Sequence, residues 1–106
     1  MNQSGHIADE QESMQQGLKV FGDTWTLAII GVLSEAERRF NELQRNLDNI
    51  SPTTLTNRLK KLEQLGLIAQ QKQTVDQLSV LYVLTEKGKN MLPVLRAIET
   101  FSKKFL

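Results

Sequence analysis

The chain has 106 residues and a formal net charge of +1, and its 40% hydrophobic and 24% charged residues are typical of one folded domain rather than of a disordered chain. It contains no cysteine, which excludes disulfides, thiolate zinc sites and cysteine nucleophiles within these residues, and its one histidine excludes histidine metal clusters and Ser/His/Asp triads. We therefore predict a protein that is not an enzyme and that needs no cofactor.

The N-terminal segment is predicted to lack regular structure. Residues 1–11 are polar, show no apolar periodicity and do not resemble a secretory signal, so we expect them to be frayed or disordered. The remaining residues, 12–106, are expected to form a single domain. No apolar run in the chain is long enough to cross a bilayer, and the sequence predicts a cytoplasmic protein without a membrane partner.

Two helices are predicted next. Apolar residues repeat at helical spacing from Met14 to Phe21, and Gly22 follows where a C-terminal cap is needed. Asp23 is placed to cap a second helix over residues 24–33, which is apolar on nearly all sides and is therefore expected to be buried.

A short helix is predicted in the middle of the chain. Residues 38–40 are expected to form a very short strand. Asn41 and Gln44 then resemble the capping box that starts a helix, and this helix is expected to end at Leu47 after about two turns.

A longer helix follows a break after Leu47. Ser51 is placed to cap free amides, and Pro52 at the first helical position gives up only an amide that had no partner. Gly66 stands where a left-handed C-terminal cap is needed, so the helix is expected over residues 52–65.

A hairpin and a last helix complete the chain. Strands are predicted over residues 67–73 and 78–84, on either side of a polar turn at 74–77. Thr85 is placed to cap a final helix, which Pro93 is expected to kink or divide. Together these elements predict a mainly α fold with a small β-hairpin, a winged helix-turn-helix.

The helix over residues 52–65 has two contrasting faces. Its leucines lie within about 80° of one another and are expected to be buried; they are Leu55, Leu59, Leu62 and Leu65. The opposite face carries hydroxyl and amide side chains early and lysines later, the order that suits base edges and then phosphates in a major groove. A helix whose polar side only faces water is the alternative interpretation.

The charge of the chain is polarised. Residues 1–37 carry a net charge of −5, residues 38–72 of +4 and residues 73–106 of +2. A basic middle segment in a nearly neutral chain favours a local anionic partner, although a solvated helix face can carry the same charges.

The order of short motifs along residues 14–105 resembles the HxlR-type family of bacterial transcription regulators, which are relatives of the MarR type. The matching residues are Gly22 to Leu27, Arg39 to Leu43, Ile50 to Pro52, Leu55 to Leu59, Leu62-Glu63, Gly66 to Ile68, Tyr82 to Thr85 and Gly88. The resemblance implies a homodimeric repressor or activator that binds double-stranded DNA through one recognition helix per subunit.

Candidate DNA-binding residues follow from this resemblance and from the basic segment. They are Arg39, Ser51, Thr53, Thr54, Asn57, Arg58, Lys60, Lys61 and Lys72. Arg58 lies near the edge of the buried stripe, so its guanidinium is expected either to reach a phosphate or to pair with Glu42 or Glu63. Arg39 has the same two interpretations.

The resemblance also implies that the first and last helices form a dimer seam. Its expected residues are Met14, Leu18, Phe21, Met91, Leu95, Ile98, Phe101 and Phe105. The alternative is that this stripe packs on the core of its own chain. A two-fold dimer would bind an inverted-repeat operator with half-sites about 34 Å apart.

The chain departs from the family pattern near its N-terminus, in the wing and in the second strand. The family's N-terminal sensor cysteine is replaced by the neighbourhood of Gln11 and Glu12, so no thiol switch is expected there. In the wing, Gln70 replaces a usual Arg and Gln77 a usual Pro, which predicts either a weaker grip on DNA or a shifted wing. Leu81 replaces a usual Glu.

A small-molecule effector and a protein are the two other partners that the sequence allows. A small-molecule effector would bind between the dimer helices and the DNA-binding core, near Trp25 and Phe21, but no set of polar residues identifies it. The competing function is a winged-helix module that binds a protein and not DNA, which an exposed apolar patch on the recognition helix or wing would favour.

Overall fold

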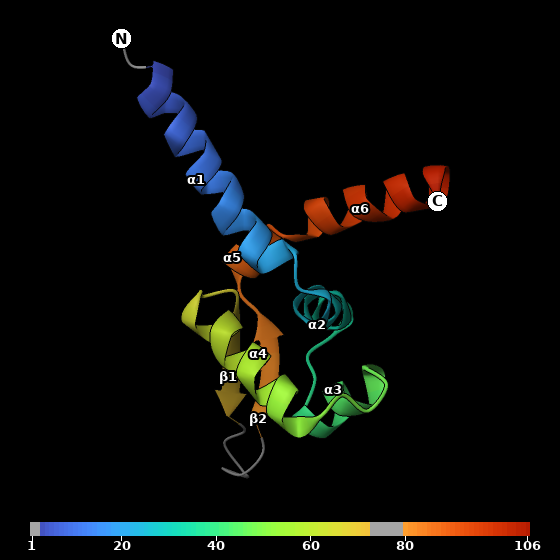
Figure 1. Ribbon diagram of the computed structural model, residues 1–106. Coiled ribbons are helices and arrows are strands. Elements are labelled where there is room, and N and C mark those ends of the chain that lie inside the picture. The colour runs from blue at the N-terminus through green and yellow to red at the C-terminus, as the bar shows by residue number, and fades with distance from the viewer. Residues whose placement is uncertain (1–2, 73–79) are drawn as a thin grey trace.

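The computed structural model describes residues 3–72 and 80–106, with side chains from residue 9 onward (Figure 1). Six helices and a two-stranded antiparallel sheet make up these residues. In chain order they are α1 (Gln3–Phe21), α2 (Thr24–Glu35), α3 (Phe40–Asn46), α4 (Pro52–Gln64), β1 (Ile68–Lys72), β2 (Val80–Leu84), α5 (Glu86–Lys89) and α6 (Leu92–Phe105). The predicted class, mainly α with a small hairpin, is confirmed.

The boundary between α1 and α2 lies where the sequence places it. The backbone N–H of Gly22 donates to Leu18 O (2.7 Å) as α1 ends, and the Asp23 carboxylate accepts from the Trp25 N–H (3.0 Å) as α2 begins. The start of α1 is different: the helix begins at Gln3 rather than near residue 12, because residues such as Glu10, Gln11 and Glu12 favour a helix even without an apolar repeat. The division of the chain into a tail and a domain stays a prediction.

The cap of α3 is shifted from its expected position. The backbone N–H of Arg39 donates to the Glu42 carboxylate (2.8 Å), so the helix starts at Phe40 and the predicted box of Asn41 and Gln44 is wrong. Gln44 instead donates to Ile50 O (3.2 Å) and so ties the end of the loop to α3.

The helix α4 has the expected caps. Ser51 Oγ accepts from the Thr54 N–H (3.1 Å), and Gly66 follows the helix with a φ of +74°. Leu55, Leu59 and Leu62 of the expected stripe are buried, Leu59 being 2% exposed, whereas Leu65 is half-buried because it lies just past the end of the helix. The stripe packs in a core shared with α2 and α3, whose buried members include Ile29, Ile30 and Leu43.

The hairpin pairs Ile68 with Leu84 at one end and Lys72 with Val80 at the other. The expected strand over residues 38–40 is reduced to one bridge, between Arg38 and Tyr82. The predicted turn at 74–77, with Gln77, lies outside the described residues.

The segment after the hairpin is divided into two helices, as predicted. Thr85 caps only α5, accepting from the Gly88 N–H (3.0 Å), and α6 then begins with Pro93 in its first turn. Gly88 is required here because a Cβ on it would lie 2.0 Å from Leu67 O. The backbone of α5 therefore packs directly on the chain that enters β1.

Two helices project from the rest of the molecule. Figure 1 shows α1 and α6 pointing away from the part that holds α2, α3, α4 and the hairpin. The radius of gyration is 16.3 Å, whereas a compact chain of this length has about 13 Å. Of the described helices, none alone is both long and apolar enough to cross a membrane; the bent pair Asp9–Phe21 and Thr24–Glu35, at 71°, meets that test only together.

Candidate nucleic-acid interface

The outward face of α4 is a polar surface. Thr53, Asn57, Lys60 and Lys61 are exposed, as the sequence predicts, while the leucines opposite them are buried. Gln64 shares this exposed face and was missed, although its position three to four residues after Lys60 and Lys61 places it there. The face offers hydroxyl and amide groups in the first half of the helix and ammonium groups in the second half.

Two hydroxyls at the start of α4 bind each other. Ser51 Oγ donates to Thr54 Oγ1 (3.0 Å) in addition to capping the Thr54 N–H. Ser51 is exposed and Thr54 is half-buried. Because both groups already hold the helix start together, Thr53 and Asn57 are the better placed of the polar side chains to contact another molecule.

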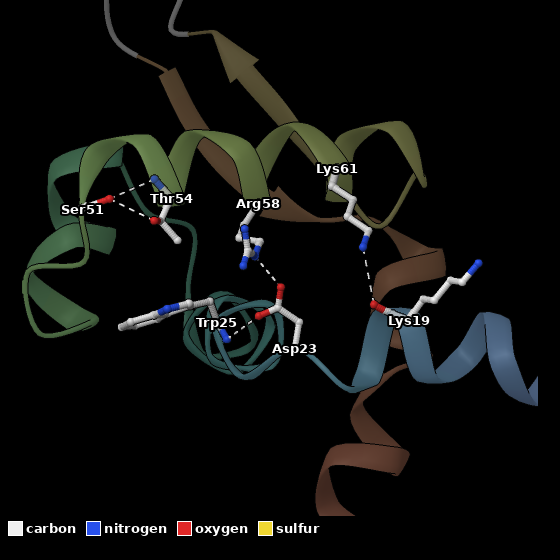
Figure 2. A network of polar contacts seen from close by, with 7 residues as sticks. All are labelled: Lys19, Asp23, Trp25, Ser51, Thr54, Arg58 and Lys61. Carbon is white, nitrogen blue, oxygen red and sulfur yellow. Dashed lines mark hydrogen bonds and ion pairs between the residues drawn. The ribbon is translucent and has the colours of Figure 1, made fainter.

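Arg58 is paired within the chain, with a partner that the sequence did not suggest. Its guanidinium Nε donates to the Asp23 carboxylate, which lies between α1 and α2 (Figure 2). The expected pairing with Glu42 or Glu63 is therefore wrong. The two side chains are 32% and 22% exposed, so the ion pair is partly sheltered from water.

Lys61 extends in the same direction as Arg58. Its ammonium Nζ donates to Lys19 O (3.5 Å), in the last turn of α1 (Figure 2). Arg58 and Lys61 are three residues apart and thus share one flank of the helix. This flank faces the junction of α1 and α2.

Three other candidate cations have no partner of opposite charge among the described residues. Arg39, Lys60 and Lys72 are exposed and form no ion pair with any residue that the structure describes. The same is true of Arg45 on α3, which was not among the predicted residues. The intramolecular pairing proposed for Arg39 is thus not found within residues 3–72 and 80–106.

The wing is less basic than the helix. Its described residues present Gln70 and Lys72 to solvent. Tyr82 lies half-buried in β2, where burial and the negative charge of Glu63 raise the pKa of its phenol above 10.0. The phenol is therefore neutral near pH 7 and adds no charge to the wing.

Apolar exposure is concentrated on the projecting helices. The large hydrophobic side chains exposed among the described residues are Met14, Leu18, Val94, Ile98, Phe101, Phe105 and Leu106. All belong to α1, α6 and the C-terminus, and none to α4 or the described part of the hairpin. Five expected seam residues are in this set.

Three expected seam residues are not exposed in this way. Met91 is 4% exposed and belongs to the core of its own chain, so its place in an intermolecular seam is corrected. Phe21 and Leu95 are half-buried against that core. Met91 lies in the link between α5 and α6. Its side chain therefore does not follow the helical spacing of α6 and points into the core instead.

Two hollows lie beside the projecting helices. A groove of about 610 Å³ runs between α2 and α6, and a smaller apolar hollow of about 190 Å³ is lined by Phe21, Leu67 and Met91 among others. Trp25, half-buried against the core, lines neither. Within the described part of the chain, no cluster of His, Asp and Glu has the arrangement of a metal site.

The Asp23 carboxyl makes the stability of the fold depend on pH. Burial raises the pKa of this carboxyl, but the hydrogen bond and charge of Arg58 and the backbone N–H groups of Trp25 and Thr26 outweigh it and hold the pKa below its ordinary 3.8. A lowered pKa in the folded state contributes stability that is present above pH 3.8 and is lost as the pH falls through the lowered value. The variant Asp23→Asn is expected to be less stable than the unaltered protein near pH 6, and this gap should close below pH 3.8.

Thermal unfolding followed by circular dichroism between pH 2 and pH 7 measures this gap. Asn also caps helices well, so the comparison isolates the charge rather than the cap. A gap of constant size down to pH 2 would show that the carboxylate charge contributes nothing.

The chain is similar in sequence and structure to known helix-turn-helix regulators. The pattern of the HxlR-like helix-turn-helix family matches residues 20–106. The HTH-type transcriptional regulator YodB of Bacillus subtilis is 32% identical over 92 residues, which are 87% of this chain and 82% of YodB. An uncharacterised HTH-type transcriptional regulator of Methanothermobacter thermautotrophicus is 31% identical over 93 residues, 88% of this chain and 71% of that protein. The structure of reduced YodB matches with a TM-score of 0.78 and 31% identity, covering 88% of this chain and 91% of that one.

Proposed function

Because this chain belongs to the HxlR-like helix-turn-helix family of transcriptional regulators, we propose that it acts as a homodimer on an inverted-repeat operator in duplex DNA. The helix α4 lies in the major groove, and the hairpin contacts the backbone or the minor groove. Two such helices related by a two-fold axis reach half-sites about 34 Å apart. Since the partner is chromosomal DNA, the proposed location is the cytoplasm.

The observation that carries the proposal is the contrast between the two faces of α4. Its leucines are buried in the core, whereas Thr53, Asn57 and Lys60 are exposed. The major groove offers donors and acceptors that amide and hydroxyl groups distinguish, and phosphates that ammonium groups neutralise.

Dimerisation is supported by the exposed apolar residues of α1 and α6. Met14, Leu18, Phe101 and Phe105 are each more than half exposed in the single chain. Burial of this apolar surface between two chains would stabilise the dimer by about 25 cal/mol for each Å² removed from water.

The competing function, a module that binds only proteins, has less support. It calls for an apolar patch on the recognition helix or the wing, but the exposed large hydrophobic residues of the described chain lie elsewhere.

A small molecule that regulates DNA binding is not identified by the residues of this chain. YodB has been seen in a quinone-bound and a diamide-treated form, but the present 106 residues contain no cysteine, so we propose no thiol chemistry for them.

Selection of bound duplexes from a random library tests the proposal. The purified protein is expected to enrich an inverted repeat with a single preferred spacing. An absence of enrichment even at low salt would favour the protein-binding module.

Two substitutions on α4 are expected to act differently on operator binding. Lys60→Ala should weaken binding to all sequences alike and reduce the slope of log affinity against log salt by about 1.8, the contribution of one phosphate per subunit of the dimer. Asn57→Ala should cost about 1–3 kcal/mol at the base pairs it contacts and relax the preference there. Fluorescence anisotropy with operator and scrambled duplexes at several salt concentrations separates the two effects. An equal loss on both duplexes for Asn57→Ala would contradict base recognition by this residue.

A further inference from the structure

The recognition helix is tied to the junction of α1 and α2 by two cationic side chains. Arg58 donates to the Asp23 carboxylate, and Lys61 Nζ donates to Lys19 O (3.5 Å) (Figure 2). The Asp23 carboxylate has a second role, since its other oxygen caps α2 at the Trp25 N–H (3.0 Å). One side chain thus joins the start of α2 to the middle of α4.

We infer that Asp23 and Arg58 are positioning residues that set the orientation of the recognition helix relative to α1, and so the half-site spacing that the dimer accepts. The inference rests on the proposed function, because a spacing has meaning only for two recognition helices on one duplex. It assigns Arg58 to the protein interior rather than to DNA.

The geometry of α1 gives this ion pair a long lever to act on. The helix projects from the molecule, and among its side chains from residue 9 onward those of Val20 and Phe21, in the last turn, pack against the core. Its 19 residues form a lever about 28 Å long at 1.5 Å per residue. A rotation of about 10° at the junction would move the far end by about 5 Å, more than the rise of one base pair.

The burial and the ion pair of Arg58 favour this role over a phosphate contact. Its side chain is about two-thirds buried and already holds Asp23, whose side chain is 22% exposed. Turning Arg58 toward DNA would leave the Asp23 charge without its partner, which is costly for a sheltered group. Lys60, exposed and without an ion pair among the described residues, carries no such penalty.

The two roles of Arg58 predict opposite effects of changing Asp23. If the pair positions α4, loss of the Asp23 charge should have the same consequence as loss of the Arg58 charge. If Arg58 instead contacts a phosphate, Asp23→Asn frees the guanidinium and should leave operator affinity unchanged or raise it.

The experiment is a selection from a random duplex library with the unaltered protein, Asp23→Asn, Arg58→Gln and the double variant. Asn still caps α2, and thermal unfolding shows that each variant is folded. We expect all variants to keep the base preference within each half-site and to accept several spacings where the unaltered protein accepts one. The affinity for the original spacing should fall about tenfold or more as the geometry for two simultaneous contacts is lost. The double variant should be no worse than either single one.

Salt dependence supplies the matched control. On a duplex that carries a single half-site, where spacing plays no part, Arg58→Gln should leave the slope of log affinity against log salt unchanged, whereas Lys60→Gln should reduce it by about 0.9. If Arg58→Gln lowers that slope while Asp23→Asn changes neither spacing nor affinity, Arg58 contacts DNA and the inference is overturned. Should Asp23→Asn not fold, Asp23→Ser takes its place, because serine also caps but is too short to reach Arg58. Failure of the unaltered protein to enrich any duplex would overturn the proposed function itself, a result distinct from unchanged spacing in the variants.

Discussion

Replacing Leu59 by Ala is expected to lower the free energy of unfolding by about 2–5 kcal/mol, because a side chain in the middle of the core is removed. Leu59 is 2% exposed and lies between Leu55 and Leu62 on the buried face of α4. Its loss leaves a cavity that the rigidly packed neighbours from α2 and α3 fill only in part. Urea denaturation followed by circular dichroism gives the value directly.

The adjacent residue provides the control. Lys60 is exposed, and Lys60→Ala should change the free energy of unfolding by no more than about 0.5 kcal/mol while reducing affinity for DNA. A Leu59→Ala variant as stable as Lys60→Ala would mean that α4 does not pack in solution as described.

Replacing Phe101 by Glu is expected to separate the dimer and to lower operator affinity by about 10²–10⁴-fold, because two linked half-site contacts become independent. Phe101 is 56% exposed in the single chain, and its ring lies 5.2 Å from that of Phe105 on the same face of α6. A carboxylate buried there between two chains would lack a partner and would therefore oppose association. Analytical ultracentrifugation measures the dimer, and fluorescence anisotropy measures the affinity.

Thr100→Glu is the matched control. It introduces the same charge next to Phe101, at an exposed position about 100° around the helix, and should leave both the dimer and the affinity nearly unchanged. Equal effects of the two substitutions would point to charge rather than to the apolar face of α6 as the cause. An unaltered protein that sediments as a monomer would rule out the proposed seam.

Local signals predicted several boundaries of the fold correctly. Asp23, Ser51 and Gly66 each act on backbone groups within three residues, so their effect is visible in the sequence. The capping of α3 was misplaced because two overlapping patterns compete there, and the carboxylate of Glu42 rather than the side chain of Asn41 reaches a free amide.

The candidate site was predicted in part. The exposed face of α4 follows from helical spacing, and Thr53, Asn57, Lys60 and Lys61 lie there. The partner of Arg58 could not be predicted, since Asp23 is 35 residues away and belongs to another element. The same holds for Gly88, whose requirement arises from contact with Leu67 O.

The sequence by itself determined most of the helices and the two strands of the hairpin, but not the start of α1. It also determined which side of α4 is apolar and which family the motif order resembles. These properties depend on backbone groups and side chains a few residues apart. Only the tertiary structure decided that Arg58 is bound to the α1–α2 junction, that Met91 belongs to the core, and that α1 and α6 project with their apolar residues exposed. These features depend on how separate elements pack, and packing brings together groups whose separation along the chain carries no signal of their contact.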